Sequence, residues 1–280
     1  MICFLCNMTW EGNIRKMHTS LHNGEAQYRL PLYDITTPGV EVNMNELVGK
    51  EIRIEFEGEI HCRETGQLIK KTFGEGFSYK AWLDSPLATE SIIRPELSRI
   101  HEGIALRDKE WEIRNHLVPH YTYLSLTSDI KVGVTRVENI PSRWIDQGAI
   151  EAVAIAKTPY RQAAGLIEVA LKDYLTDKTN WRHMIMDQRT NSMSLLEKRA
   201  EILELIPEEF EEFVLWDDEV MKIHFPVERY PVKVNSLKLD KFRLIEKKLA
   251  GIKGQYLLFG DNTVINLRSH SAYRIKLSAE

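Results

Sequence analysis

The sequence has few of the features that mark membrane-spanning or secreted proteins. Its three cysteines, Cys3, Cys6 and Cys62, cannot form a fully paired disulfide set, which favours a reducing, cytoplasmic compartment. No stretch reaches about 18 consecutive apolar residues, so we expect no membrane span. The first residues, MICFLCNMTWEG, have no basic segment followed by a long apolar run, and no signal peptide is predicted.

Several common catalytic fingerprints are also missing from the sequence. It contains no GxSxG, no P-loop and no GxGxxG followed by an acidic residue, so hydrolase-elbow, NTPase and dinucleotide-binding classes lack support. There is no internal repeat and no low-complexity tract. The 280 residues are 43% hydrophobic and 28% charged, which is the balance of an ordinary globular protein. This length predicts one large domain or two to three small modules.

The charges are distributed unevenly along the chain, although its net charge is only −4. Residues 206–221 contain seven acidic and no basic residues, whereas residues 222–280 contain twelve lysines and arginines against five acidic residues. This basic end favours binding of a polyanion, although the acidic run could simply solvate a neighbouring basic module. The candidate nucleic-acid-binding residues are Lys241, Arg243, Lys247, Lys248 and Lys253.

Alternating patterns predict strands in the first sixty residues and again near the middle of the chain. AQYRLPLYDI (26–35) and EIRIEFEGEI (51–60) alternate between apolar and polar residues. Residues 80–116 are polar and weakly periodic, which predicts loops with short helices. Residues 121–126 and 131–136 favour strands and are joined by Thr127, Ser128 and Asp129, so they predict a hairpin. AVAIAK (152–157) predicts a third strand.

Two helices are expected after this third strand. TPYRQAAGLIEVALKDYL (158–175) begins with Thr158 as an N-cap and Pro159 at the first helical position. Its apolar residues recur at helical spacing: Ala163, Ile167, Leu171 and Tyr174. SLLEKRAEILELI (194–206) predicts the second helix, with Pro207 near its end.

The last part of the chain contains four short strand candidates, at residues 230–239, 254–260, 263–269 and 273–277. Short strands at this spacing are typical of a small barrel. We therefore expect an α+β protein with an N-terminal β-rich module (1–116), a central α/β domain (117–205) and a basic C-terminal β-barrel (206–280).

The order of elements in the middle of the chain resembles the GIY-YIG nuclease superfamily over roughly residues 119–185. Tyr123 lies where the GIY tyrosine would be, and KVG (131–133) lies where YIG would be. Arg143, followed by a tryptophan, resembles the catalytic arginine, and Glu168 resembles the metal-binding carboxylate. Asn180, in TNW, resembles a later asparagine of that superfamily. The resemblance implies a catalytic set of Tyr123, Lys131, Gly133, Arg143, Glu168 and Asn180, with Mg²⁺ or Mn²⁺ bound at Glu168.

These residue types suit phosphodiester cleavage, which needs a base for water and relief of the charge that develops on the phosphate. An arginine fork matches phosphate oxygens, and Mg²⁺ is often held by one or two carboxylates with several waters. Lys131 departs from the superfamily, because a tyrosine often serves as the base at this position. Gly133 favours a site, since glycine weakens a strand unless something must approach closely.

Each of these residues also has an ordinary structural explanation. Tyr123 could be a strand aromatic, Lys131 a solvated strand residue and Arg143 a surface charge. Glu168 could form an ion pair with Lys172, four residues later. The sequence leaves these alternatives open.

The chain as a whole resembles a bacterial family, domain of unknown function 2797, through the phrases KVGVTR, RWIDQGA, TNWR and GIKGQYL. That family typically has several CxxC pairs before the hairpin, which implies a zinc module. Here Cys62 stands alone, with Thr65 in place of its partner and Ser78 and Ala81 in place of a second pair. A structural zinc site needs about four ligands, so we expect no zinc between residues 62 and 120.

The functional expectation is therefore a metal-dependent nuclease that acts on DNA or RNA. One alternative is a catalytically inactive nucleic-acid-binding protein that keeps the scaffold, and another is a protein-binding adaptor. If the nuclease interpretation holds, Tyr123, Gly133, Arg143 and Glu168 must converge, because a single phosphate has to reach them all.

Overall fold

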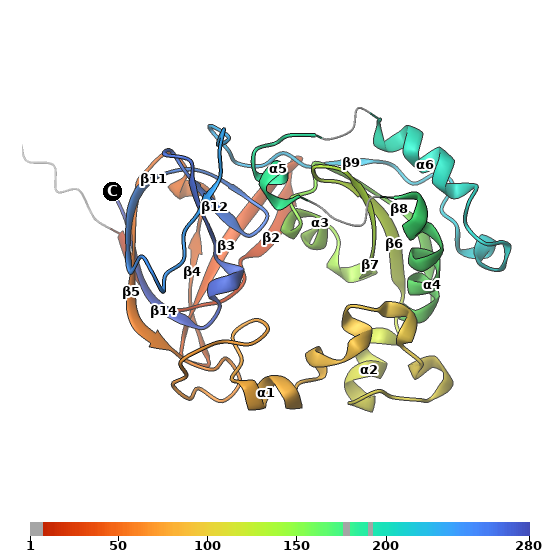
Figure 1. Cartoon of the computed structure of the whole chain (residues 1–280), viewed down its shortest axis with the longest axis horizontal. Helices are drawn as coiled ribbons and strands as arrows, with labels where there is room; N and C mark the ends of the chain where they lie inside the picture. Colours follow the sequence, from red (N-terminus) through yellow and green to blue (C-terminus); the bar gives the residue numbers. More distant parts are fainter. Residues whose placement is uncertain (1–7, 176–179, 190–192) are drawn as a thin grey trace, which may run out of the picture. The chain divides into compact units, whose positions relative to one another are not determined.

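The computed structural model describes residues 8–175, 180–189 and 193–280, and Figure 1 shows it as a mixed α+β protein. The α+β class expected from the sequence is confirmed. The chain forms two compact units. Unit 1 combines Met1–Asp84 with His224–Glu280, and unit 2 consists of Ser85–Ile223. This division differs from the three consecutive modules expected from the sequence, because the two ends of the chain fold together.

Unit 1 is built on a ten-stranded sheet in the order β10-β13-β12-β11-β5-β14-β1-β3-β2, with β4 paired to β3. The strands from the first part of the chain are β1 (Met8–Ile14), β2 (His18–His22), β3 (Glu25–Asp34), β4 (Thr37–Asn43) and β5 (Glu51–Ile60). Those from the last part are β10 (Asn235–Ser236), β11 (Leu244–Lys253), β12 (Tyr256–Phe259), β13 (Thr263–Asn266) and β14 (Tyr273–Ala279). Short helices η1 (Asn45–Leu47), α1 (Tyr79–Asp84) and η9 (Arg268–His270) complete the unit.

The expected C-terminal barrel over residues 206–280 is a wrong prediction, since the sheet has two ends, β10 and β2, and is not closed. β14 lies between β1 and β5, and β11 pairs with β5. The buried faces of the last strands are thus completed by strands from the first sixty residues. A pattern read along the sequence cannot reveal such distant pairing.

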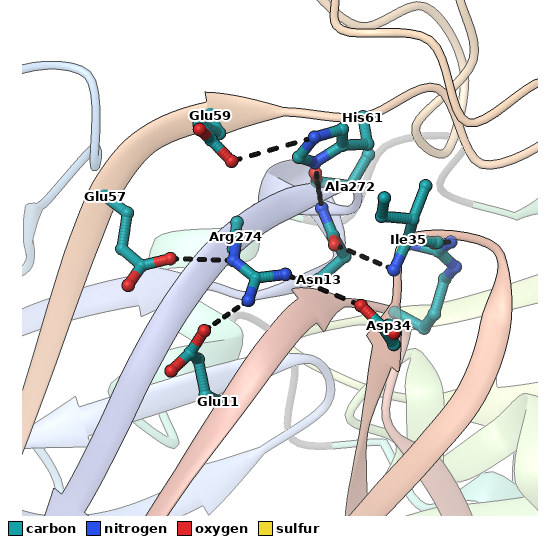
Figure 2. Close-up of polar contacts among 10 residues, drawn as sticks. Glu11, Asn13, Asp34, Ile35, Glu57, Glu59, His61, Ala272 and Arg274 are labelled. Carbon is teal, nitrogen blue, oxygen red and sulfur yellow. Dashed lines mark hydrogen bonds and ion pairs between the residues drawn. The ribbon is translucent and has the colours of Figure 1, made fainter.

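A polar network ties these distant strands together, as Figure 2 shows. The Arg274 guanidinium on β14 pairs with Glu11 on β1 and with Glu57 on β5, the latter at 2.9 Å. Asn13 is fully buried on β1; its amide donates to Ala272 O at 2.8 Å, and its Oδ1 accepts from Ile35 N at 3.2 Å. These contacts satisfy buried polar groups where three strands meet.

Unit 2 contains a four-stranded antiparallel sheet in the order β7-β6-β8-β9. Its strands are β6 (His120–Leu126), β7 (Ile130–Arg136), β8 (Glu151–Thr158) and β9 (Met221–Lys222). The segment before β6 forms η2 (Pro86–Ala88), η3 (Glu90–Ile92), η4 (Pro95–Leu97), η5 (Ile100–Glu102) and α2 (Lys109–His116). The later helices are η6 (Val137–Asn139), α3 (Ser142–Asp146), α4 (Arg161–Leu171), η7 (Lys172–Tyr174), α5 (Trp181–Ile185), α6 (Leu195–Leu203) and η8 (Glu208–Phe213).

The two faces of this sheet have different neighbours, because side chains alternate along each strand. Leu124 and Val153 point to the face covered by α4 and α6, where they pack with Ile167 and Ile202 in one apolar core. Figure 1 shows α3 and α5 on the other side of the sheet. Tyr123, one residue from Leu124, therefore faces α3. The expected hairpin, third strand and both helices are confirmed.

The expected start of α4 is two residues too early. Thr158 is the last residue of β8, where it pairs with His120, and Tyr160 holds the N-cap position before Arg161. The pairing of the strand outweighs the capping preference of threonine. None of the helices within the described ranges is long and apolar enough to cross a membrane.

Candidate functional site

Tyr123 and Gly133 lie directly opposite each other on β6 and β7. A Cβ atom on Gly133 would lie only 2.6 Å from Tyr123 Oη and 2.7 Å from its Cζ. Glycine is therefore needed at this position because the tyrosine ring lies across it. The close approach expected from the sequence is present, and the group that approaches is the Tyr123 side chain.

The hydroxyl of Tyr123 is held by residues of α3 and the turn after it. It donates a hydrogen bond to Gln147 Oε1 at 3.0 Å, and the Arg143 guanidinium lies beside it. The ring of Trp144 packs edge-on against Tyr123, with centroids 5.9 Å apart. Burial raises the pKa of Tyr123, and the neighbouring Arg143 opposes this effect only in part. Tyr123 is thus a neutral, fixed phenol at ordinary pH.

Lys131 is two residues before Gly133 on β7, so it faces the same side of the sheet as Tyr123. Its pKa is lowered to about 8 by burial and by the positive charge of Arg143. A lysine with this pKa has an appreciable neutral fraction near neutral pH, which a solvated surface lysine lacks. Lys131 is therefore the group of this cluster best suited to accept a proton.

Glu168 lies on α4 and is mostly buried, with 14% of its side chain exposed. Its Oε2 is 3.8 Å from Lys172 Nζ, so the expected ion pair is present as a long contact. The charge of Glu168 also acts on Tyr123 and on Arg161. Tyr123 thus packs over Gly133 with Arg143 beside its hydroxyl, and the charge of Glu168 acts on it; that the four residues form one catalytic site stays a prediction.

Asn180 does not contribute to this cluster through any contact that the structure records. It is the exposed N-cap of α5, and its Oδ1 accepts from Arg182 N at 3.1 Å and from His183 N at 3.5 Å. Its position is explained by helix capping. Its catalytic role stays a prediction.

The five cations proposed at the C-terminal end do not form a common free surface. Lys253 is fully buried, and its ammonium lies 5.3 Å from the Phe225 ring centroid and 5.1 Å from that of Tyr230. Its assignment as a surface phosphate ligand is therefore corrected. Lys247 pairs with Asp261, and Lys248 lies 3.2 Å from Glu228. Lys241 and Arg243, both exposed, are the two that stay candidates for a phosphate contact.

The donor set at Glu168 fits only a metal ion that takes its other ligands from water and substrate. Within residues 8–175, 180–189 and 193–280, no group of three or more His, Cys, Asp or Glu side chains could hold a metal ion. A single carboxylate is still compatible with Mg²⁺, which usually keeps several waters and binds substrate phosphates. Glu168 is the residue that would hold it.

The region of the missing cysteine pairs is held by hydrogen bonds instead. Ser78 N donates to Cys62 Sγ at 3.2 Å, and Ala81 N donates to Ser78 Oγ at 3.2 Å. Burial works against a thiolate at Cys62, but hydrogen bonds from Thr65, Ser78 and Glu64 outweigh it and lower its pKa to about 7. The expectation that no zinc binds here stays a prediction. Cys3 and Cys6 lie outside the described residues.

Two residues of the cluster were missed by sequence reasoning, Gln147 and Arg161. Gln147 lies within RWIDQGA, and the only signal was its closeness in sequence to Arg143. Arg161 lies seven residues before Glu168, a spacing that places both on one face of a helix. This spacing could have identified Arg161.

A comparison with protein-family profiles shows the family to which the chain belongs. The profile of the family described as "Protein of unknown function (DUF2797)" matches residues 49–275. The chain belongs to this family. No curated protein and no solved structure matches the chain. In this DUF2797 protein the matched region includes all of unit 2 and, from the sheet of unit 1, β5, β10 to β13 and the start of β14.

Proposed function

We propose that this DUF2797 protein cleaves phosphodiester bonds of DNA or RNA at the cluster of Tyr123, Lys131, Arg143 and Glu168, as a GIY-YIG-like nuclease. The observation that carries the proposal is that Tyr123 packs over Gly133 with Arg143 beside its hydroxyl, while the charge of Glu168 on α4 also acts on Tyr123. A partly buried arginine, a partly buried carboxylate and a lysine with a lowered pKa are the groups that phosphodiester cleavage requires.

Each residue has a distinct role in this proposal. Arg143 binds the phosphate oxygens and offsets the charge that develops on them. Lys131, in its neutral form, accepts the proton of the attacking water. Tyr123 positions Arg143 and stays protonated, because burial raises the pKa of its hydroxyl. Bound at Glu168, Mg²⁺ or Mn²⁺ would supply further charge stabilisation at the phosphate.

A second function, nucleic-acid binding without cleavage, is favoured by a different observation. Glu168 already has Lys172 at 3.8 Å and lies near Arg161, so its charge has partners within the protein. A chain that kept the scaffold and lost catalysis would retain these ion pairs and the phosphate-binding arginines. The exposed Lys241 and Arg243 of unit 1 would add to binding in either case.

The test is cleavage of supercoiled plasmid and of labelled RNA with Mg²⁺ or Mn²⁺, and with chelator as the blank. Glu168→Gln should abolish cleavage while the fold and most of the binding remain, because it removes the charge that holds a hard cation. Glu201→Gln is the matched control, since Glu201 is also a helical carboxylate paired to a lysine, Lys198, at 3.0 Å. Binding by the unmodified chain without cleavage of any substrate would favour the scaffold function.

A further inference from the structure

Ser125 is a buried serine on β6 that lies directly opposite Lys131 on β7. Directly paired residues of an antiparallel ladder point to the same face of the sheet, with their Cβ atoms about 4.5–5.5 Å apart. On the other side of β6, Ser125 pairs with Ala152 of β8. The three residues therefore form one row across the sheet, on the face that also carries Tyr123, two residues before Ser125.

The hydroxyl of Ser125 has no hydrogen-bond partner among the residues that the structure describes, although this side chain is fully buried. A buried hydroxyl without a partner is costly, and most buried polar groups of folded proteins have one. The main-chain groups of β6 are already engaged, because this strand is paired along its length with β7 on one side and β8 on the other. A partner for the hydroxyl must therefore come from a side chain or a bound group on this face.

The neighbours of Ser125 along β6 and β8 cannot supply this partner. The hydroxyl of Tyr123 already donates to a glutamine at 3.0 Å, and the hydroxyl of Thr127, two residues after Ser125, donates to the main chain of the turn at 3.4 Å. Ala152 has only a methyl group. Lys131 is the neighbour in the row that can donate a hydrogen bond to the serine oxygen, and its flexible four-carbon stem lets the amine reach it.

The surroundings of Lys131 make such a contact valuable. Burial lowers the pKa of Lys131 to about 8, and the positive charge of Arg143 on α3 acts in the same direction. Ser125 beside it is uncharged, and the phenol of Tyr123 is neutral at ordinary pH because burial raises its pKa. A buried amine gains more from one hydrogen-bond acceptor than a solvated lysine does, because little water is present to take its place.

We propose that Ser125 is a positioning residue for Lys131: its Oγ accepts a hydrogen bond from the lysine amine and so directs the lone pair of the neutral amine away from the sheet, towards the attacking water. An amine rotates about its last bond, and a general base is effective only when its lone pair faces the proton that it accepts. This catalytic role rests on the proposed function, in which Lys131 takes the proton of water. The contact between the two side chains does not depend on cleavage.

The first measurement follows the titration of Lys131 by ¹³C NMR of the full chain labelled at the ε-carbons of its lysines. The signal of Lys131 is the one that disappears in Lys131→Met. An oxygen acceptor favours the charged amine over the neutral amine, so Ser125→Ala should lower the pKa of Lys131 by about one pH unit. This variant removes a single oxygen atom from a buried position and should not disturb the fold.

Ser91→Ala is the matched control in the same unit. Ser91 on η3 is also fully buried, and its hydroxyl also has no partner within residues 8–175, 180–189 and 193–280. Because Ser91 lies outside the row that contains Lys131, this variant should leave the titration of Lys131 unchanged. An unchanged titration in Ser125→Ala, or an equal shift in Ser91→Ala, would overturn the proposal.

A double-mutant cycle of cleavage rates provides the second measurement. Ser125→Ala should lower the maximum rate about three- to tenfold, the size of one lost hydrogen bond, and the rate should level off at a lower pH. In the Lys131→Met background the same change should have no further effect, because the amine that Ser125 positions is gone. Equal losses in the two backgrounds would show that Ser125 acts through packing alone and would overturn the proposal.

The two measurements separate this inference from the proposed function. A shifted titration of Lys131 in Ser125→Ala, in a chain that cleaves no substrate, would reject the nuclease and leave the contact between the two side chains standing. Cleavage that depends on Lys131, with an unshifted titration in Ser125→Ala, would support the nuclease and reject the role of Ser125.

Discussion

The two units differ in the surroundings of their lysine and arginine side chains. Unit 1 has twenty lysines and arginines against seventeen acidic residues, and unit 2 has seventeen against twenty-four. Yet unit 1 engages Lys247, Lys248 and Arg274 in ion pairs and buries Lys253. In the more acidic unit 2, the charges of Arg136 on β7, Arg143 on α3 and Glu168 on α4 all act on Arg161. Under the proposed function, local arrangement and not net charge decides where a phosphate binds.

The largest effect on the cleavage rate is expected from substitution of Lys131 in unit 2. Because its pKa is lowered to about 8, Lys131 is mostly protonated below that pH and becomes neutral above it. The cleavage rate should therefore rise about tenfold per pH unit below pH 8 and level off above it. Lys131→Met should lower the rate by about 10²–10⁴-fold and flatten this profile, as expected for loss of a general base.

Lys241→Met is the matched control in unit 1. In this variant the cleavage rate should depend on pH in the same way as in the unmodified chain. Initial rates of plasmid nicking between pH 6 and pH 9.5 provide the measurement. A Lys131→Met profile that follows the unmodified chain would show that Lys131 is only a strand residue.

Arg143→Ala should produce the next largest effect. The charge that develops on the phosphate would lose its partner, and the cleavage rate should fall about 10²–10³-fold. Arg243→Ala, which removes an exposed arginine of unit 1, should reduce the rate at most about threefold. Single-turnover rates at saturating protein distinguish this loss from weaker binding. Equal losses of cleavage rate in Arg143→Ala and Arg243→Ala would contradict the assignment of the phosphate-binding arginine to unit 2.

Gly133→Ala should destabilise unit 2 and displace Tyr123. The added methyl group would lie 2.6 Å from Tyr123 Oη, and overpacking of this kind costs about 1–3 kcal/mol of unfolding free energy. Gly260→Ala is the control in unit 1, where nothing lies within 4 Å of the added atom. Urea unfolding of both variants gives the comparison, and an unchanged midpoint for Gly133→Ala would contradict the packing described for Tyr123.

The smallest effects are expected for the paired lysines of unit 1. Lys247→Gln and Lys248→Gln should each change nucleic-acid affinity by no more than about twofold, because Asp261 and Glu228 already neutralise them. Fluorescence anisotropy with labelled single-stranded 20-residue DNA and RNA would measure this. A fall of tenfold or more in either variant would place the main phosphate contacts on unit 1.

Local patterns were enough to predict the hairpin β6–β7, the strand β8 and the helix carrying Glu168. A close approach at Gly133 was also predicted, since an isolated glycine in a strand implies one, but that the approaching group is the Tyr123 ring was not. Unit 1 was predicted poorly because its sheet joins β14 to β1 and β5, strands more than two hundred residues away. β11 was missed because LIEKKLAGIK carries three consecutive charged residues.

Burial and pairing of single side chains were equally invisible in the sequence. Lys253 and Lys241 have the same side chain. The Lys253 ammonium lies against aromatic rings in the interior, whereas Lys241 is exposed. Arg161 was overlooked because its contacts, Ser91 and Ile92, lie about seventy residues earlier in a segment without regular periodicity. Only the folded structure shows which lysine and arginine side chains are buried and what they contact.

The most direct test of the central claim is a crystal of the full chain soaked with Mn²⁺ and a phosphorothioate oligonucleotide that resists cleavage. Anomalous scattering would locate the ion. The account predicts a manganese peak at the Glu168 carboxylate, with a phosphate of the strand on Arg143. A peak at another site with the strand bound away from Arg143, in a chain that cleaves the unmodified oligonucleotide, would contradict it.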